Sequence, residues 1–173
     1  MTKKLMTAAL ALLVLVTAAY ADEPVVAVSA DEIRANAAVL EGHEYVSTGQ
    51  PDQEILKMAG DAGYAAVVDL RTDSEDRGLD EAAAVEALHM RYVRLPIAGA
   101  DDVTFENAAR LDEILAGIDG PVLLHCASGN RVGALFALRA SRAGASDEEA
   151  LEVGKAAGLT RLEATVRERL AGE

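Results

Sequence analysis

The stretch VLLHCASGNRVGALF, residues 122–136, joins an apolar run, a short polar loop and the start of a helical pattern. The loop contains Cys126, the only cysteine among the 173 residues, and Arg131 five positions later. A short apolar run of this kind is typical of a strand buried on both faces of a parallel sheet. The stretch therefore predicts a strand that turns through Gly129 into a helix, with Cys126 where the strand ends.

Apolar strand-length runs and helical patterns alternate along the rest of the chain. The predicted strands are residues 44–50, 64–70, 91–97 and 120–125. The predicted helices are residues 29–42, 51–58, 80–90, 104–118, 131–143, 146–158 and 160–170. Pro51 suits the first position of its helix, and Ser146 with Glu149 forms a capping box. This alternation predicts an α/β fold with a mostly parallel central sheet flanked by helices.

The N-terminal residues have the pattern of an export signal. Lys3 and Lys4 precede an uncharged, mostly apolar run over residues 5–19, and Ala19-Tyr20-Ala21 has the small-x-small form of a cleavage site. The run is shorter than the ~20 apolar residues of a membrane span. We expect a signal peptide over residues 1–21 and a periplasmic or secreted product without stable membrane insertion. An uncleaved anchor is the alternative. Residues 22–43 then form an N-terminal helical segment, and residues 44–173 form the α/β domain.

Composition limits the kind of partner and site. The formal net charge of −13 argues against nucleic acid and anionic membranes as partners, so an anion site has to be built locally. A single cysteine cannot form an internal disulfide. His43, His89 and His125 stand apart, with no cysteine or histidine at ligand spacing, so neither a metal nor another cofactor is expected. The oligomeric state stays open.

The loop after the predicted strand has the elements of an anion-binding site. The N-terminus of the following helix offers unpaired amides and a partial positive charge. Gly129 permits a positive φ, and the planar fork of Arg131 suits two oxygens of a tetraoxo anion. Such settings lower a cysteine pKa from about 8.5 to roughly 3.5–7.5. We therefore expect Cys126 to be a nucleophile rather than a buried small hydrophobe.

Three segments together resemble a known family. They are STGQPDQEILKMAGDAGYAAVVDLRTDSED (47–76), MRYVRLPI (90–97) and GPVLLHCASGNRVGALFAL (120–138). They are similar to the phosphatase-like domain of β-lactamase hydrolase-like proteins, which is related to dual-specificity and tyrosine cysteine phosphatases. The resemblance covers roughly residues 45–158.

The resemblance implies a cysteine-phosphatase fold and hydrolysis of phosphate monoesters, carried by a small molecule or a protein. It implies Cys126 as nucleophile through a phosphocysteine and Arg131 as the phosphate-binding arginine. The backbone amides of Ala127, Ser128, Gly129 and Asn130 would complete the cradle. His125 matches the supporting histidine before the nucleophile.

Two features keep other functions open. Four residues separate Cys126 from Arg131, whereas cysteine phosphatases usually have five; four is usual in rhodanese-type sulfurtransferases, which form a persulfide. Val132 stands where a serine or threonine commonly helps the thiolate leave. A sulfurtransferase using a Cys126 persulfide and a non-catalytic phosphate-binding module are the alternatives.

The general acid is expected in the loop after the strand at 91–97. Asp102 and Asp101 lie there, about where such enzymes place their acid, although both also suit a solvated loop before a helix. Asp69 and Arg71 end another buried strand near the edge of the predicted site and favour a structural ion pair over catalysis.

The remaining polar residues near the predicted site have simpler interpretations. Gln50-Pro51 is interpreted as a helix start, and Glu75 and Asp76 as loop charges. The hydroxyl of Ser128 either stabilises the thiolate or serves the turn.

Overall fold

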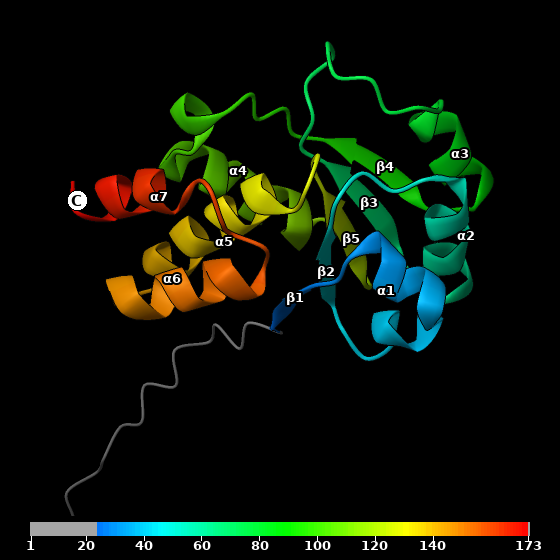
Figure 1. Cartoon of the computed structure of the whole chain (residues 1–173), viewed down its shortest axis with the longest axis horizontal. Helices are drawn as coiled ribbons and strands as arrows, with labels where there is room; N and C mark the ends of the chain where they lie inside the picture. The colour runs from blue at the N-terminus through cyan, green and yellow to red at the C-terminus, as the bar shows by residue number, and fades with distance from the viewer. Residues whose placement is uncertain (1–23, 173) are drawn as a thin grey trace, which may run out of the picture.

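The computed structural model describes residues 24–172, so the predicted signal peptide lies outside the described residues. Five parallel strands form one sheet in the order β1-β2-β5-β3-β4 (Figure 1). The strands are β1 (Val25–Ala27), β2 (Tyr45–Thr48), β3 (Ala66–Asp69), β4 (Arg91–Arg94) and β5 (Val122–His125). The four predicted strands are confirmed with shorter bounds. Strand β1 was not predicted, and it places part of the N-terminal segment in the sheet.

Helices cover both faces of the sheet, as predicted (Figure 1). One face carries α1 (Ala30–Ala35), α2 (Gln53–Asp61) and α3 (Glu81–Ala87), with the 3-10 helix η1 (Ala37–Leu40). The other side holds α4 (Phe105–Ala116), α5 (Asn130–Arg142), α6 (Asp147–Ala156) and α7 (Glu163–Leu170), with the 3-10 helix η2 (Ala100–Asp102). Among the described residues, no helix is long and apolar enough to cross a membrane.

Some helix boundaries differ from the sequence prediction. Pro51 does not begin α2; Asp52 is the N-cap, and its carboxylate accepts a hydrogen bond from the Ile55 amide at 2.9 Å. An aspartate satisfies a free helical amide, which the proline ring cannot do. The last helix begins at Glu163 rather than at residue 160. The capping box of Ser146 and Glu149 at the start of α6 is confirmed.

Strand β5 separates two apolar layers because its side chains alternate between the faces of the sheet. Leu123 packs into the layer beneath α1–α3, whereas Leu124 and Cys126 pack into the layer beneath α4 and α5. His125 therefore points toward the α1–α3 side, one residue from a thiol on the other side. Consecutive residues at the end of one strand thus enter different environments.

Helix α5 follows the loop directly and fixes its C-terminal end. Most of its residues are buried, and it crosses α6 at Gly133 and Gly154. A Cβ built on Gly133 would lie 2.2 Å from the backbone nitrogen of Leu159, so only glycine allows this approach. The N-terminus of α5 is consequently fixed against the rest of the domain.

Candidate active site

The loop between β5 and α5 starts at the carboxyl end of the central strand, where open α/β sheets bind ligands. Cys126 is 1% exposed, whereas Ala127 and Ser128 are exposed and mark where the loop meets solvent. Gly129 is the N-cap of α5 in the left-handed conformation, with φ of 77°. A Cβ there would also approach the Ser47 hydroxyl at 3.3 Å. The predicted glycine turn is confirmed.

Asn130 anchors the loop to a distant segment. Its side-chain oxygen accepts hydrogen bonds from the Thr160 amide at 2.8 Å and from the Leu162 amide at 3.3 Å. The Thr160 hydroxyl donates to the same oxygen at 3.1 Å. The side-chain oxygen of Asn130 thus binds the connection between α6 and α7 and fixes the start of α5.

The guanidinium of Arg131 is held on two sides. Nη1 and Nη2 donate to the two carboxylate oxygens of Glu75 at 2.8 and 2.7 Å, and Nη1 also donates to the Ile97 carbonyl at 2.7 Å. The Glu75 hydrogen bonds raise the pKa of Arg131, and Cys126 favours the charged form as well. The sequence-predicted nucleophile and arginine are therefore brought together.

Glu75 is paired with Arg131, so its interpretation as a simple loop charge was wrong. The hydrogen bonds from Arg131 lower the pKa of Glu75 to about 2, with help from Thr72, whose amide donates to it at 2.9 Å. Arg71 contributes a further contact at 3.3 Å. The only sequence signal was the spacing of Thr72 and Glu75 after a buried strand, which resembles a capping box.

The two candidate acids have different surroundings. Asp101 is exposed, while the carboxylate of Asp102 accepts a hydrogen bond from the Ala98 amide at 2.7 Å. Ala98 follows Ile97, whose carbonyl binds Arg131. No hydrogen bond or ion pair among the described residues joins either aspartate to Cys126 or Arg131. The hydrogen bond from Ala98 nevertheless fixes Asp102 next to Ile97, whose carbonyl accepts from Arg131.

The sequence favoured an ion pair between Asp69 and Arg71, but the Asp69 carboxylate does not pair with the Arg71 side chain. The Arg71 amide donates to Asp69 Oδ1 at 2.7 Å, but the Arg71 guanidinium turns toward Gln50 and Glu75. Arg77 instead reaches Asp69 Oδ2 at 2.6 Å, and the Tyr92 hydroxyl donates to the same oxygen at 2.7 Å. Burial opposes ionisation of Asp69, but the His125 charge and these hydrogen bonds outweigh it and lower its pKa.

Asp69, Glu81 and His125 lie together behind the loop and are called the buried triad. Asp69 and His125 are register partners on neighbouring strands. His125 Nε2 lies 2.6 Å from Glu81 Oε1 and 3.6 Å from Asp69 Oδ1. Gln50 donates to the other Glu81 oxygen at 2.9 Å. The predicted supporting histidine thus has carboxylate neighbours, of which Glu81 was missed because it lies far from His125 in sequence.

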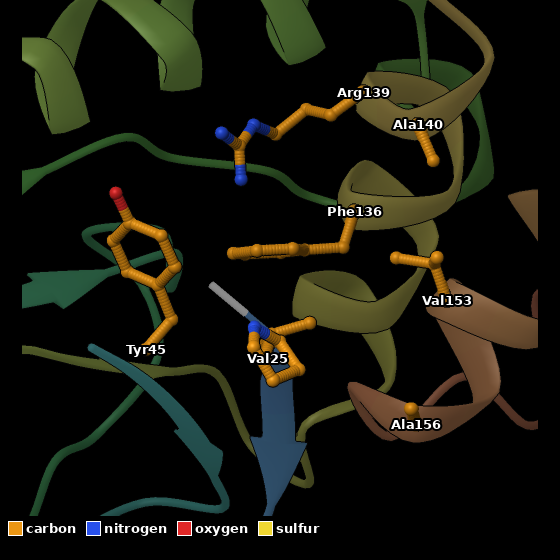
Figure 2. Close-up of a pocket in the computed structure, with 8 residues that line it drawn as sticks. Val25, Tyr45, Phe136, Arg139, Ala140, Val153 and Ala156 are labelled. Carbon is orange, nitrogen blue, oxygen red and sulfur yellow. The ribbon is translucent and has the colours of Figure 1, made fainter. Parts of the chain in front are cut away.

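A separate cavity of about 170 Å³ lies at the amino ends of β1 and β2, whereas the loop lies at the carboxyl end of β5. Figure 2 shows Phe136 and Arg139 of α5 facing Tyr45 and Val25, which begin β2 and β1. The Arg139 guanidinium lies over the Phe136 ring at 4.5 Å and pairs with Asp112 at 2.5 Å. The lining is mainly apolar and does not include the loop. This cavity does not suit a phosphoryl group.

The chain is similar in sequence to known proteins. The model of the family described as β-lactamase hydrolase-like protein, phosphatase-like domain, matches residues 42–145. A β-lactamase hydrolase-like protein of Xylella fastidiosa strain Temecula1 is 32% identical over 95 residues, which are 53% of this chain and 22% of that protein. The chain therefore corresponds to less than a quarter of the relative's length.

Solved structures share the fold. A Neisseria meningitidis Z2491 protein superposes with a TM-score of 0.63 at 19% identity, covering 73% of this chain and 92% of that one. P. aeruginosa TpbA in complex with pTyr gives a TM-score of 0.51 at 20% identity, covering 72% and 76%. The parallel sheet with flanking helices is the cysteine-phosphatase fold, as the sequence analysis predicted.

Proposed function

Because the chain belongs to the family of phosphatase-like domains of β-lactamase hydrolase-like proteins, we propose that it hydrolyses phosphate monoesters through a phosphocysteine at Cys126. The family and fold support a cysteine-type phosphatase.

One observation carries this proposal: the lone thiol and a doubly anchored arginine share one glycine-capped loop at the start of α5. Glu75 and the Ile97 carbonyl occupy donors of Nη1 and Nη2, so the orientation of the guanidinium is set before a ligand arrives. Donors preorganised in this way stabilise the charge of a transferring phosphoryl group. The backbone amides of residues 127–130, which lead into the N-terminus of α5, add to the same field.

In the first step, the Cys126 thiolate attacks phosphorus in line with the leaving oxygen. A P–S bond forms as the P–O bond to the leaving group breaks, and Asp102 in its acid form gives that oxygen a proton. Arg131 holds two of the three remaining phosphoryl oxygens. Asp102 is preferred to Asp101 because its carboxylate is fixed to the Ala98 amide beside Ile97.

In the second step, water attacks the phosphocysteine. The P–S bond breaks, the thiolate leaves, inorganic phosphate is released, and the Asp102 carboxylate takes the proton from water. Val132 is buried in the same apolar layer as Cys126 and offers the leaving thiolate no hydroxyl. The second step is therefore the slower one in the proposed cycle.

The test is phosphate release from an aryl phosphate by reduced protein, with Cys126→Ser as control. The proposal expects turnover by the wild type, inhibition by vanadate and no turnover by the variant. Absence of turnover over about pH 5 to pH 8 with aryl, alkyl and peptide phosphates would reject it.

The four residues between Cys126 and Arg131 favour a second candidate, a sulfurtransferase. There the thiolate attacks the outer sulfur of thiosulfate, sulfite leaves, and the persulfide passes its sulfur to cyanide. Thiocyanate formation with a persulfide on Cys126 and no phosphate turnover would favour this reaction.

Substrate and location are also proposals. The resemblance and the pTyr bound by TpbA support a phosphorylated protein or small molecule as substrate. The pattern over residues 1–21 supports export, and fractionation of cells that express the full chain tests it.

A further inference from the structure

The cavity at the amino ends of β1 and β2 takes no part in the proposed reaction. Val25, Phe136 and Val153 give it apolar walls, as Figure 2 shows. Pro24 and Ala156, which also line the cavity, are exposed, so its rim reaches solvent. An apolar cavity of about 150 Å³ binds a single benzene ring. The volume of about 170 Å³ therefore leaves room for one ring with a short substituent.

Two aromatic side chains in the lining favour a flat ligand. The ring centroids of Tyr45 and Phe136 lie 6.0 Å apart, and their planes are inclined at 59°. Aromatic pairs are most stable when they are tilted or offset, with centroids ~4.5–7 Å apart. A ligand ring beside these two side chains makes the same kind of contact, in addition to the gain from burying its area. The lining thus prefers an aromatic ring to an aliphatic chain of equal size.

A positive charge remains at one side of the cavity. Among the described residues that line it, Arg139 is the only charged one. Arg139 Nε donates to Asp112 at 2.5 Å, and Arg142 lies 3.6 Å from the other oxygen of Asp112. Two guanidinium groups thus share one carboxylate, which leaves an excess of one positive charge. The side chain of Arg139 is 14% exposed, so water screens its charge poorly.

The guanidinium of Arg139 also has donors to spare. It lies 4.5 Å from the centroid of the Phe136 ring and 5.9 Å from that of Tyr45, as Figure 2 shows. Within the described part of the chain, Nη1 and Nη2 make no hydrogen bond. A carboxylate accepts two parallel N–H bonds from such a planar fork. A phosphate dianion needs more donors than this one side chain supplies.

We propose that this cavity binds a small aromatic carboxylate. The ligand ring lies against Tyr45 and Phe136, and its carboxylate accepts from the terminal nitrogens of Arg139. The volume excludes the chain of a long fatty acid. The site shares no residue with the loop from Cys126 to Arg131, and its ligand undergoes no reaction there. The proposal therefore does not depend on the proposed function.

The first experiment is a ¹H–¹⁵N NMR titration of the reduced protein with three probes: phenylacetate, its neutral analogue phenylacetamide, and acetate. We expect phenylacetate to shift amides around the cavity with a dissociation constant on the order of 1 mM or lower. Phenylacetamide should bind about tenfold more weakly, because it lacks the charge-assisted hydrogen bonds, and acetate should not bind. Equal affinities of the amide and the carboxylate would overturn the proposal, as would the absence of binding by phenylacetate.

A competition experiment excludes the loop as the binding site. Inorganic phosphate, the product of the proposed reaction, is added at about 10 mM to the protein with phenylacetate, at a level well above that expected for the loop. The shifts around the cavity should persist. Shifts that disappear on addition of phosphate would place the probe in the loop and overturn the proposal. Turnover is not measured, so a protein without phosphatase activity gives the same result.

The variants test the two halves of the site separately. Ala156→Phe puts a ring at the exposed rim and should lower the affinity for phenylacetate at least tenfold by filling the cavity, whereas Ala156→Ser should bind as the wild type does. Arg139→Gln should weaken phenylacetate about tenfold and leave phenylacetamide unchanged. Arg167→Gln, which removes an exposed positive charge from α7, is the matched control and should change neither.

Unchanged binding of phenylacetate by Arg139→Gln, or by Ala156→Phe, would contradict the proposal. Arg139 also pairs with Asp112, so its loss affects the fold as well as the site. Should Arg139→Gln fail to fold, the comparison of phenylacetate with phenylacetamide in the wild type and the two Ala156 variants decide.

Discussion

The loop from Cys126 to Arg131 and the buried triad meet at the end of β5, and they are built in opposite ways. The loop is a continuous piece of chain whose backbone and two side chains form one site. The buried triad comes from β3, β5 and α3 and forms only when the chain folds. A site within one segment is visible in the sequence, whereas a site assembled from several segments is not.

The two regions also differ in how charge is treated. In the loop, the buried guanidinium of Arg131 is paired with Glu75, whose side chain is 25% exposed. The buried triad pairs its charges without solvent, where removal of one partner leaves an uncompensated charge. We therefore expect substitutions of Cys126 and Arg131 to act on turnover, and substitutions in the buried triad to act on turnover and stability together.

The largest expected effect is that of Cys126→Ser. Replacing the thiolate with a hydroxyl removes the nucleophile, so phosphate release should fall by at least ~10³-fold. The fold should be unchanged, because serine is close in size to cysteine. Steady-state assays with circular dichroism check this. Turnover close to that of the wild type would exclude Cys126 as the nucleophile.

Arg131→Lys should have the next largest effect. A lysine keeps the charge but cannot bind Glu75 and two phosphoryl oxygens as a planar fork, so kcat/KM should fall roughly 10²–10³-fold. Arg142→Lys, at an exposed position of the same helix, is the matched control and should change nothing. Equal activities of the two variants would remove Arg131 from the site.

Asn130→Ala should mainly lower stability. The substitution removes the acceptor of three part-buried hydrogen bonds from Thr160 and Leu162, which costs about 1–3 kcal/mol of unfolding free energy. Asn130→Asp retains the accepting oxygen and should lose less. Urea unfolding measures both. A turnover loss without a stability loss in Asn130→Ala would mean that the side chain binds substrate.

Glu75→Gln should have the smallest effect, and that effect depends on pH. The folded pKa of about 2 lies below the ordinary value of 4.5, so the pair with Arg131 stabilises the fold above about pH 4.5 and loses this contribution as the pH falls toward 2. After solvent screening we expect on the order of 1–2 kcal/mol. The stability difference between wild type and Glu75→Gln should shrink between pH 6 and pH 3 in urea unfolding. A constant difference would mean that the ion pair contributes nothing.

The sequence predicted the sheet and the loop well for a physical reason. Strands β3 and β5 are apolar on both faces, and the glycine turn, cysteine and arginine are neighbours in the chain. Strand β1 escaped prediction because three residues carry too little pattern. Its pairing with β2 comes from tertiary contacts instead.

Several charged contacts around the loop were not predicted from the sequence. Glu75 had the appearance of a solvated charge, and its partner Arg131 is 56 positions away. Glu81 lies on a helix whose composition gives no reason to point one carboxylate inward. Asp69 was placed correctly at the strand end, but its partner Arg77 was not identified. Long-range pairing of charges is set by the fold, so these contacts needed the structure.

In the proposed cycle, Cys126 carries a phosphoryl group during turnover. Rapid acid quenching after mixing reduced protein with an aryl phosphate, followed by mass spectrometry of the peptide containing Cys126, tests it directly. Because Val132 leaves the second step slow, we predict a phosphoryl group on Cys126 in most chains at early times, and none in Cys126→Ser. A persulfide formed from thiosulfate, with an unmodified cysteine after aryl phosphate, would contradict the account.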